Sequence, residues 1–172
     1  MLFSDLAKTL PDHAKDLRLN VSSLLTEQTL TDQQKWGTLV ACAHACAHKP
    51  LIEAVEAEAA DKLTPEAMNA AKASASIMAM NNIYYRFTHL ASRPDYRTMP
   101  ARLRMNVIGS PGIDKADFEL FSLAVSAING CGMCIDSHDK VLAQHGMAAE
   151  KIHTAVRIAS VVHAVARTFQ AM

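Results

Sequence analysis

Residues 114–138 read DKADFELFSLAVSAINGCGMCIDSH, and this stretch specifies two helices joined by a glycine turn. Asp114 is of a type that commonly caps a helix, and the residues from there to Ile128 are mostly apolar, which predicts a buried helix. Asn129-Gly130 should end that helix. A second helix is expected to follow the turn to Gln144 and stop at Gly146, because glycine readily adopts the left-handed conformation found at helix ends.

Helix starts recur through the rest of the chain, and no segment shows the alternating β-branched pattern of a strand. The predicted helices begin at a capping box at Thr31-Asp32-Gln33-Gln34, at Lys49-Pro50, at the N-cap Thr64-Pro65-Glu66 and at about Ala148. The third of these is expected to run toward Tyr85. The sequence therefore predicts an all-α fold, built from two related helical halves.

A weak internal repeat appears at an offset of 84 residues, for example where Ala75-Ser76-Ile77-Met78 aligns with Ala159-Ser160-Val161-Val162. It predicts a single domain over residues 1–172. We expect a degenerate half over about 1–91, a proline- and glycine-rich linker over about 92–112 and a second half, which carries the chemically active residues, over about 113–172. In this register Cys131 and Cys134 align with Ala47 and Pro50, so the chemistry should lie in the second half.

Composition excludes several classes of protein. The 17 basic and 17 acidic residues cancel, so neither a nucleic acid nor an anionic membrane is expected as a partner. The N-terminus lacks the pattern of a signal peptide and no apolar run is long enough to span a bilayer. We therefore expect a cytoplasmic protein, in which the four cysteines do not form a structural disulfide framework.

Cys131, Cys134 and His138 form the main chemical motif. Their spacings of three and four residues place all three side chains on one face of the second helix, and Met133 should point away from it. At a helix start the unpaired N–H groups stabilise a thiolate, and cysteines three residues apart there can close a disulfide. His138 lies one turn beyond Cys134 and could take its proton.

The preceding helix contributes a thin polar stripe made of Glu119, Ser122 and Ser126. Glu119 lies between Phe118 and Leu120 in sequence, and such a carboxyl group is expected to be partly desolvated, which favours its neutral form. A proton relay could use such a group. The alternative is that Glu119 lies at the helix surface, paired with a lysine.

Two alternatives to a redox dithiol remain open at this point. Cys131, Cys134, His138 and Glu119 could bind a metal, although structural zinc sites usually draw on two separated ligand pairs. The two cysteines could also simply pack. A second cluster, CAHACAH at 42–48, places its cysteines and histidines on different helix faces, so we expect Cys42 and Cys46 to pack.

Beyond these motifs, the chain resembles the AhpD family of the carboxymuconolactone decarboxylase-like superfamily over nearly its full length. The resemblance rests on LPDHAKDLRLNVSSL, IMAMNNIYYR, LRMNVIGSPGIDKADFELFSLAVSAINGC and the pattern Glu119-x11-Cys131-x2-Cys134-x3-His138. It implies an all-α homotrimer with an antioxidant, thiol-dependent activity. Such a protein reduces hydroperoxides, and passes electrons from the dihydrolipoamide of a lipoyl-bearing acyltransferase to the peroxiredoxin AhpC. A decarboxylase of the same superfamily remains an alternative.

The resemblance also assigns roles to residues. Cys134 corresponds to the reactive cysteine, which forms the sulfenic acid or the mixed disulfide. Cys131 corresponds to the partner that gives a proton and closes the Cys131–Cys134 disulfide, while Glu119 and His138 correspond to the proton relay. Well-known members of the family carry histidine where this chain has Met133. No flavin or nicotinamide motif is present, so electrons should arrive from another molecule, which the resemblance implies is dihydrolipoamide. By the same resemblance, no bound cofactor and no metal are expected.

Overall fold

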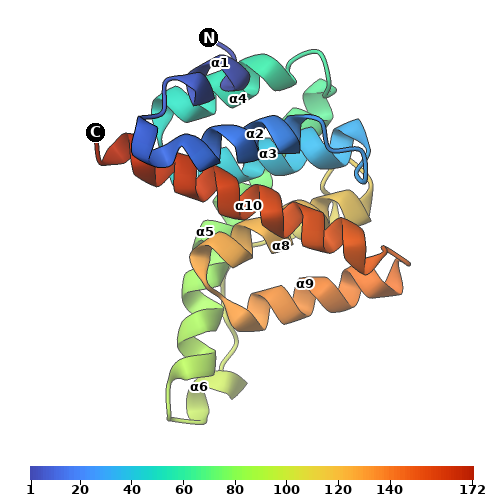
Figure 1. Ribbon diagram of the computed structural model, residues 1–172. Helices are drawn as coiled ribbons and strands as arrows, with labels where there is room; N and C mark the ends of the chain where they lie inside the picture. The colour runs from blue at the N-terminus through green and yellow to red at the C-terminus, as the bar shows by residue number, and fades with distance from the viewer.

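The computed structural model describes residues 1–172 as ten α-helices, a single 3-10 turn at Asp12–Ala14 and no strand, which confirms the all-α fold (Figure 1). The α-helices are α1 (Phe3–Lys8), α2 (Lys15–Leu25), α3 (Asp32–Cys46), α4 (Lys49–Ala59), α5 (Pro65–Leu90), α6 (Asp95–Thr98), α7 (Asn106–Gly109), α8 (Lys115–Asn129), α9 (Gly132–Gln144) and α10 (Ala149–Gln170). No helix is both long and apolar enough to cross a membrane.

Two helices, α3 and α8, pack against each other at the centre, and each also packs against α5 and α10. The side chains between them are apolar and buried, among them Leu39, Val40, Leu120 and Leu123. α9 lies against α8 and α5, which brings the first turn of α9 to the side of the central helices. The core therefore holds in place the two elements that carry the cysteine motif.

The helix ends follow the predicted capping residues. Thr31 and Gln34 form a capping box at the start of α3, and the Thr64 hydroxyl accepts a hydrogen bond from the N–H of Ala67 at the start of α5. The Asp114 carboxylate accepts hydrogen bonds from two N–H groups in the first turn of α8. Each cap accepts hydrogen bonds from backbone N–H groups that have no partner inside the helix. The local sequence therefore determines where these helices begin.

Residues that are 84 positions apart meet at the contact between α3 and α8. The Gln33 amide donates to the Asp117 carboxylate at 2.7 Å. A Cβ atom added at Gly37 would lie 2.1 Å from the Phe121 ring, so only glycine leaves room for that ring. These contacts join the two stretches of the sequence repeat, while the proposed division into two halves and a linker stays a prediction.

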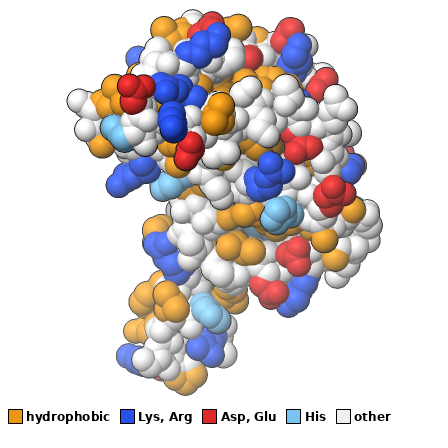
Figure 2. All heavy atoms as spheres, in the orientation of Figure 1, with side chains coloured by type: hydrophobic (Ala, Val, Ile, Leu, Met, Phe, Trp, Pro, Cys, Tyr) orange, Lys and Arg blue, Asp and Glu red, His pale blue; other side chains and the backbone are white.

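One end of α5 extends away from the rest of the molecule, with α6 at its far end (Figure 1). α5 continues to Leu90, five residues beyond Tyr85, where the sequence suggested that it would end. Ile83, Phe87 and Leu90 on this projection are more than half exposed, and apolar side chains are visible there in Figure 2. These side chains lie outside the apolar core, so burial does not mark where this end of α5 stops.

Candidate active site

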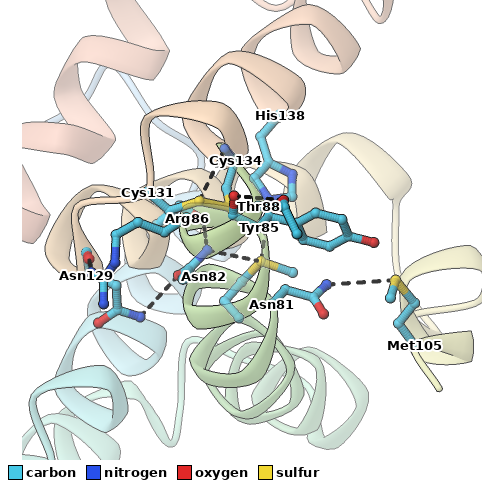
Figure 3. Close-up of a disulfide and its surroundings, with 12 residues drawn as sticks. Asn81, Asn82, Tyr85, Arg86, Thr88, Met105, Asn129, Cys131, Cys134 and His138 are labelled. Atoms are coloured by element: carbon cyan, nitrogen blue, oxygen red, sulfur yellow. Dashed lines mark hydrogen bonds between the residues drawn. A yellow bond between two sulfur atoms is a disulfide. The ribbon is translucent and has the colours of Figure 1, made fainter. Parts of the chain in front are cut away.

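A left-handed glycine sets the geometry of the cysteine motif. Gly130 has φ +69°, and the N–H of Cys131 donates to the carbonyl of Ser126 at 3.1 Å, an arrangement typical of a glycine-terminated helix. Cys131 then caps α9, and Cys134 lies in its first turn, as the Asn129-Gly130 break predicted. The two cysteines form a disulfide, with their Cα atoms 5.2 Å apart (Figure 3).

The two sulfur-bearing residues differ in access. Cys131 is fully buried, whereas Cys134 is 6% exposed to solvent and lines a cavity of about 520 Å³. The N–H of Cys134 lies 3.3 Å from the Cys131 sulfur. A molecule that enters the cavity therefore meets Cys134 and not Cys131.

Glu119 and His138 form a buried pair between α8 and α9. His138 Nδ1 lies 2.5 Å from Glu119 Oε2, and both residues are less than 9% exposed. His138 lines the same cavity as Cys134 and lies one helical turn beyond it. The fold thus brings together all four residues that the sequence identified.

The ionisation expected for Glu119 was wrong. Burial raises the pKa of this carboxyl group. Hydrogen bonds and charges from His138 and Lys115 together lower the pKa by more than burial raises it, so the net pKa lies below its ordinary value. The carboxylate is therefore ionised at neutral pH. The sequence indicated that Glu119 is desolvated, but not that two hydrogen-bond donors contact its carboxylate oxygens.

Two further residues complete the surroundings of this pair. Lys115 Nζ lies 2.7 Å from Glu119 Oε1, so Glu119 is both buried and paired with a lysine, which the sequence had suggested as alternatives. Met78 Sδ, from α5, lies 3.3 Å from His138 Nε2. Lys115 precedes Glu119 by four residues, a spacing that sequence could have flagged. Nothing in the sequence pointed to Met78, because its contact depends on how α5 packs against α9.

The serines of the polar stripe face α5 and hydrogen-bond to its side chains, not to the disulfide. Ser126 Oγ accepts a hydrogen bond from Asn82 Nδ2 of α5 at 2.9 Å. Ser122 Oγ lies 3.4 Å from the hydroxyl oxygen of a serine that is also on α5. Asn82 in turn accepts from Asn129 Nδ2 at 3.0 Å, and Arg86 donates to the Asn129 carbonyl (Figure 3). This network fixes the glycine turn against α5.

The cavity beside Cys134 has a largely apolar wall. Its apolar members come from α5, α7 and the loop before it, and α9, and they are Met78, Tyr85, Met105, Ile108, Met133 and Val141. Lys115, Glu119, Ser137 and His138 are among its polar members. Met133 was expected to point away from the cysteine face, but it is 45% exposed and forms part of this wall.

The second cysteine cluster takes no part in this site. Cys42 is fully buried in the core, as expected, and Cys46 is half-buried; neither forms a disulfide. Burial raises the pKa of Cys42 well above its ordinary value and that of Cys46 to about 11, so both stay protonated thiols. The structure also contains no group of three or more His, Cys, Asp or Glu side chains that could hold a metal ion.

Comparisons with known proteins place the chain in a family. The carboxymuconolactone decarboxylase family model matches residues 94–172, the part that carries the whole site apart from α5. Three curated relatives bear the name alkyl hydroperoxide reductase AhpD. The protein of Rhizorhabdus wittichii is 66% identical over 166 residues, which cover 96% of each chain. Those of Rhodopseudomonas palustris and Hyphomonas neptunium are 61% and 57% identical over 171 residues, covering 99% of this chain and 94% and 95% of theirs. The chain therefore belongs to the AhpD family of alkyl hydroperoxide reductases.

Proposed function

We propose that this protein is an antioxidant thiol oxidoreductase that reduces hydroperoxides with the Cys131–Cys134 dithiol. The observation that carries the proposal is a disulfide at a helix start whose outer cysteine shares a cavity with a buried His138–Glu119 pair. Its near relatives are named as alkyl hydroperoxide reductases. The apolar wall of the cavity suits the hydrocarbon part of an organic hydroperoxide.

The proposed cycle starts from the reduced dithiol. His138, held by Glu119, takes the proton of Cys134, and the thiolate attacks the terminal peroxide oxygen. The O–O bond breaks, the alcohol leaves with a proton, and Cys134 becomes a sulfenic acid. Cys131 then attacks this sulfur and displaces water. The product is a Cys131–Cys134 disulfide, and the same bond in the structure supports this step.

Electrons return through a dithiol, for which we propose dihydrolipoamide on a lipoyl-bearing acyltransferase. One of its thiolates attacks the protein disulfide, and its second thiol resolves the mixed disulfide. The dithiol is oxidised to a cyclic disulfide, and both cysteines recover their thiols. In the adaptor mode the reduced pair instead reduces an oxidised AhpC peroxiredoxin. We propose the cytoplasm as the location, because the cycle needs a pool of reduced thiols.

We also propose the homotrimer that is typical of the family. The projecting end of α5 and the segment around α6 support it. Apolar side chains on this projection are more than half exposed, and they include Ile83, Phe87, Leu90 and Met99. Several large apolar side chains exposed on one projection are typical of an interface between chains.

An assay of peroxide consumption tests the proposed function. Protein supplied with dihydrolipoamide and an organic hydroperoxide should consume the peroxide catalytically, and the rate should rise when AhpC is added. The two cysteines supply the electrons, so omission of the dithiol should stop turnover after about one equivalent per chain. The function is wrong if consumption with the dithiol equals that of the dithiol alone, with AhpC present or absent.

A further inference from the structure

Lys115 makes two contacts that tie the buried pair to the wall of the cavity. Its Nζ lies 2.7 Å from Glu119 Oε1 and 2.5 Å from the carbonyl oxygen of Ile108. Lys115 begins α8 one turn before Glu119, and its side chain is 34% exposed at the cavity. The lysine thus lies between solvent, α7 and the Glu119–His138 pair.

The two oxygens of Glu119 are held by two different side chains. Oε1 faces Lys115 and Oε2 faces His138, so the carboxylate has a single orientation in which both oxygens are paired. If Lys115 were absent, Oε1 would be buried without a donor, since Glu119 is only 3% exposed. The carboxylate could then turn or take up a proton, and either change would weaken its support of His138.

An ordinary surface ion pair would have no such consequence. Lys140 and Asp136 on α9 lie 2.8 Å apart, but both side chains are more than 60% exposed. Pairs of this kind contribute little to stability, because water screens them. The partner of Lys115 is buried and its second acceptor is a backbone carbonyl, so the position of its ammonium group is fixed by the fold.

We propose that Lys115 is a positioning residue of the redox centre, which keeps Glu119 ionised and aimed at His138 and so promotes thiolate formation at Cys134. In this role Lys115 acts through Glu119 and not on the sulfur itself. The inference rests on the proposed function of the Cys134 thiol, and the hydrogen-bonded order is Lys115, Glu119, His138.

The test is the pH dependence of alkylation of Cys134 by iodoacetamide in reduced protein, which needs no peroxide. All variants carry Cys131→Ser, so that Cys134 is the only thiol at the site, and peptide mapping separates it from Cys42 and Cys46. Lys115→Met should slow alkylation near neutral pH about tenfold, which corresponds to a rise of one unit in the apparent pKa of the thiol. Lys115→Arg should restore most of the rate, because it keeps the charge.

Lys72→Met is the matched control. Lys72 pairs with Glu56 at 2.9 Å, and Glu56 also contacts a histidine, His44, at 2.6 Å, but this group does not line the cavity of Cys134. Its alkylation profile should match that of the parent. The inference is wrong if Lys115→Met leaves the profile unmoved, or if it lowers the rate equally at every pH and arginine does not restore it. Absence of peroxide consumption by the wild-type chain would instead refute the proposed function, while the alkylation profile still decides the role of Lys115.

Discussion

Cys134→Ser is expected to reduce dithiol-driven peroxide consumption to the rate measured without protein. Serine has nearly the shape of cysteine, but its hydroxyl does not form the nucleophilic anion at neutral pH. Cys134 is also the cysteine that the cavity reaches, whereas Cys131 is fully buried behind it. Cys131 should therefore not replace it as the attacking group. Peroxide consumption with dihydrolipoamide as donor measures the loss.

Two further cysteine variants test whether the loss of activity in Cys134→Ser is specific to Cys134. Cys131→Ser should still react once with peroxide and leave a sulfenic acid on Cys134, which dimedone traps, because in the proposed cycle Cys131 acts only after the O–O bond is broken. Cys46→Ser should retain the full rate, since Cys46 is a half-buried thiol outside the site. Substantial turnover in Cys134→Ser would mean that peroxide is reduced elsewhere in the chain.

Glu119→Gln is expected to lower the rate of peroxide reduction by on the order of 100-fold, the usual contribution of acid–base support. The variant keeps the shape of the side chain but removes the charge that Lys115 and His138 share. At least one buried donor would lose its acceptor, so the free energy of unfolding at neutral pH should fall by about 1–3 kcal/mol. Turnover assays and denaturant titrations measure the two effects.

The stability effect should depend on pH in one direction. The pKa of Glu119 in the folded protein lies below its ordinary value of 4.5, so the ionised group contributes stability that is complete above that value. This contribution is lost as the pH falls through the folded-state pKa. The difference in unfolding free energy between wild type and Glu119→Gln should therefore be full near neutral pH and shrink below pH 4.5.

Glu56→Gln is the control for Glu119→Gln, because Glu56 also pairs with a histidine and a lysine. Its side chain is 29% exposed, compared with 4% for Glu119, and it lies outside the cavity of the disulfide. Glu56→Gln should leave peroxide reduction unchanged. Equal rates in the two variants would contradict the proposed relay.

The sequence predicted those features that depend on local chemistry. Thr31, Thr64 and Asp114 cap their helices as expected, and Gly130 ends α8 so that Cys131 and Cys134 fall at the start of α9. These outcomes follow from backbone donors and glycine conformation, which a few neighbouring residues determine. The proximity of Cys134 and His138 follows equally from helical spacing.

Features that depend on contacts between helices could not be predicted from the sequence pattern. Besides Lys115 on its own helix, the ionised state of Glu119 depends on His138, which lies 19 residues away on α9. The contact of Met78 with His138 spans 60 residues and depends on the packing of α5 against α9. Spacing rules describe one helix at a time, so they carry no information on which side chains meet across an interface.

In the proposed cycle, Cys131 and Cys134 are a dithiol that peroxide oxidises and dihydrolipoamide reduces. The most direct measurement is mass spectrometric peptide mapping of the reduced wild-type chain after addition of one equivalent of an organic hydroperoxide. The peptide that contains both cysteines should lose two hydrogens and regain them when dihydrolipoamide is added, while Cys42 and Cys46 stay reduced. Free thiols at Cys131 and Cys134 after the peroxide has been consumed would contradict the account.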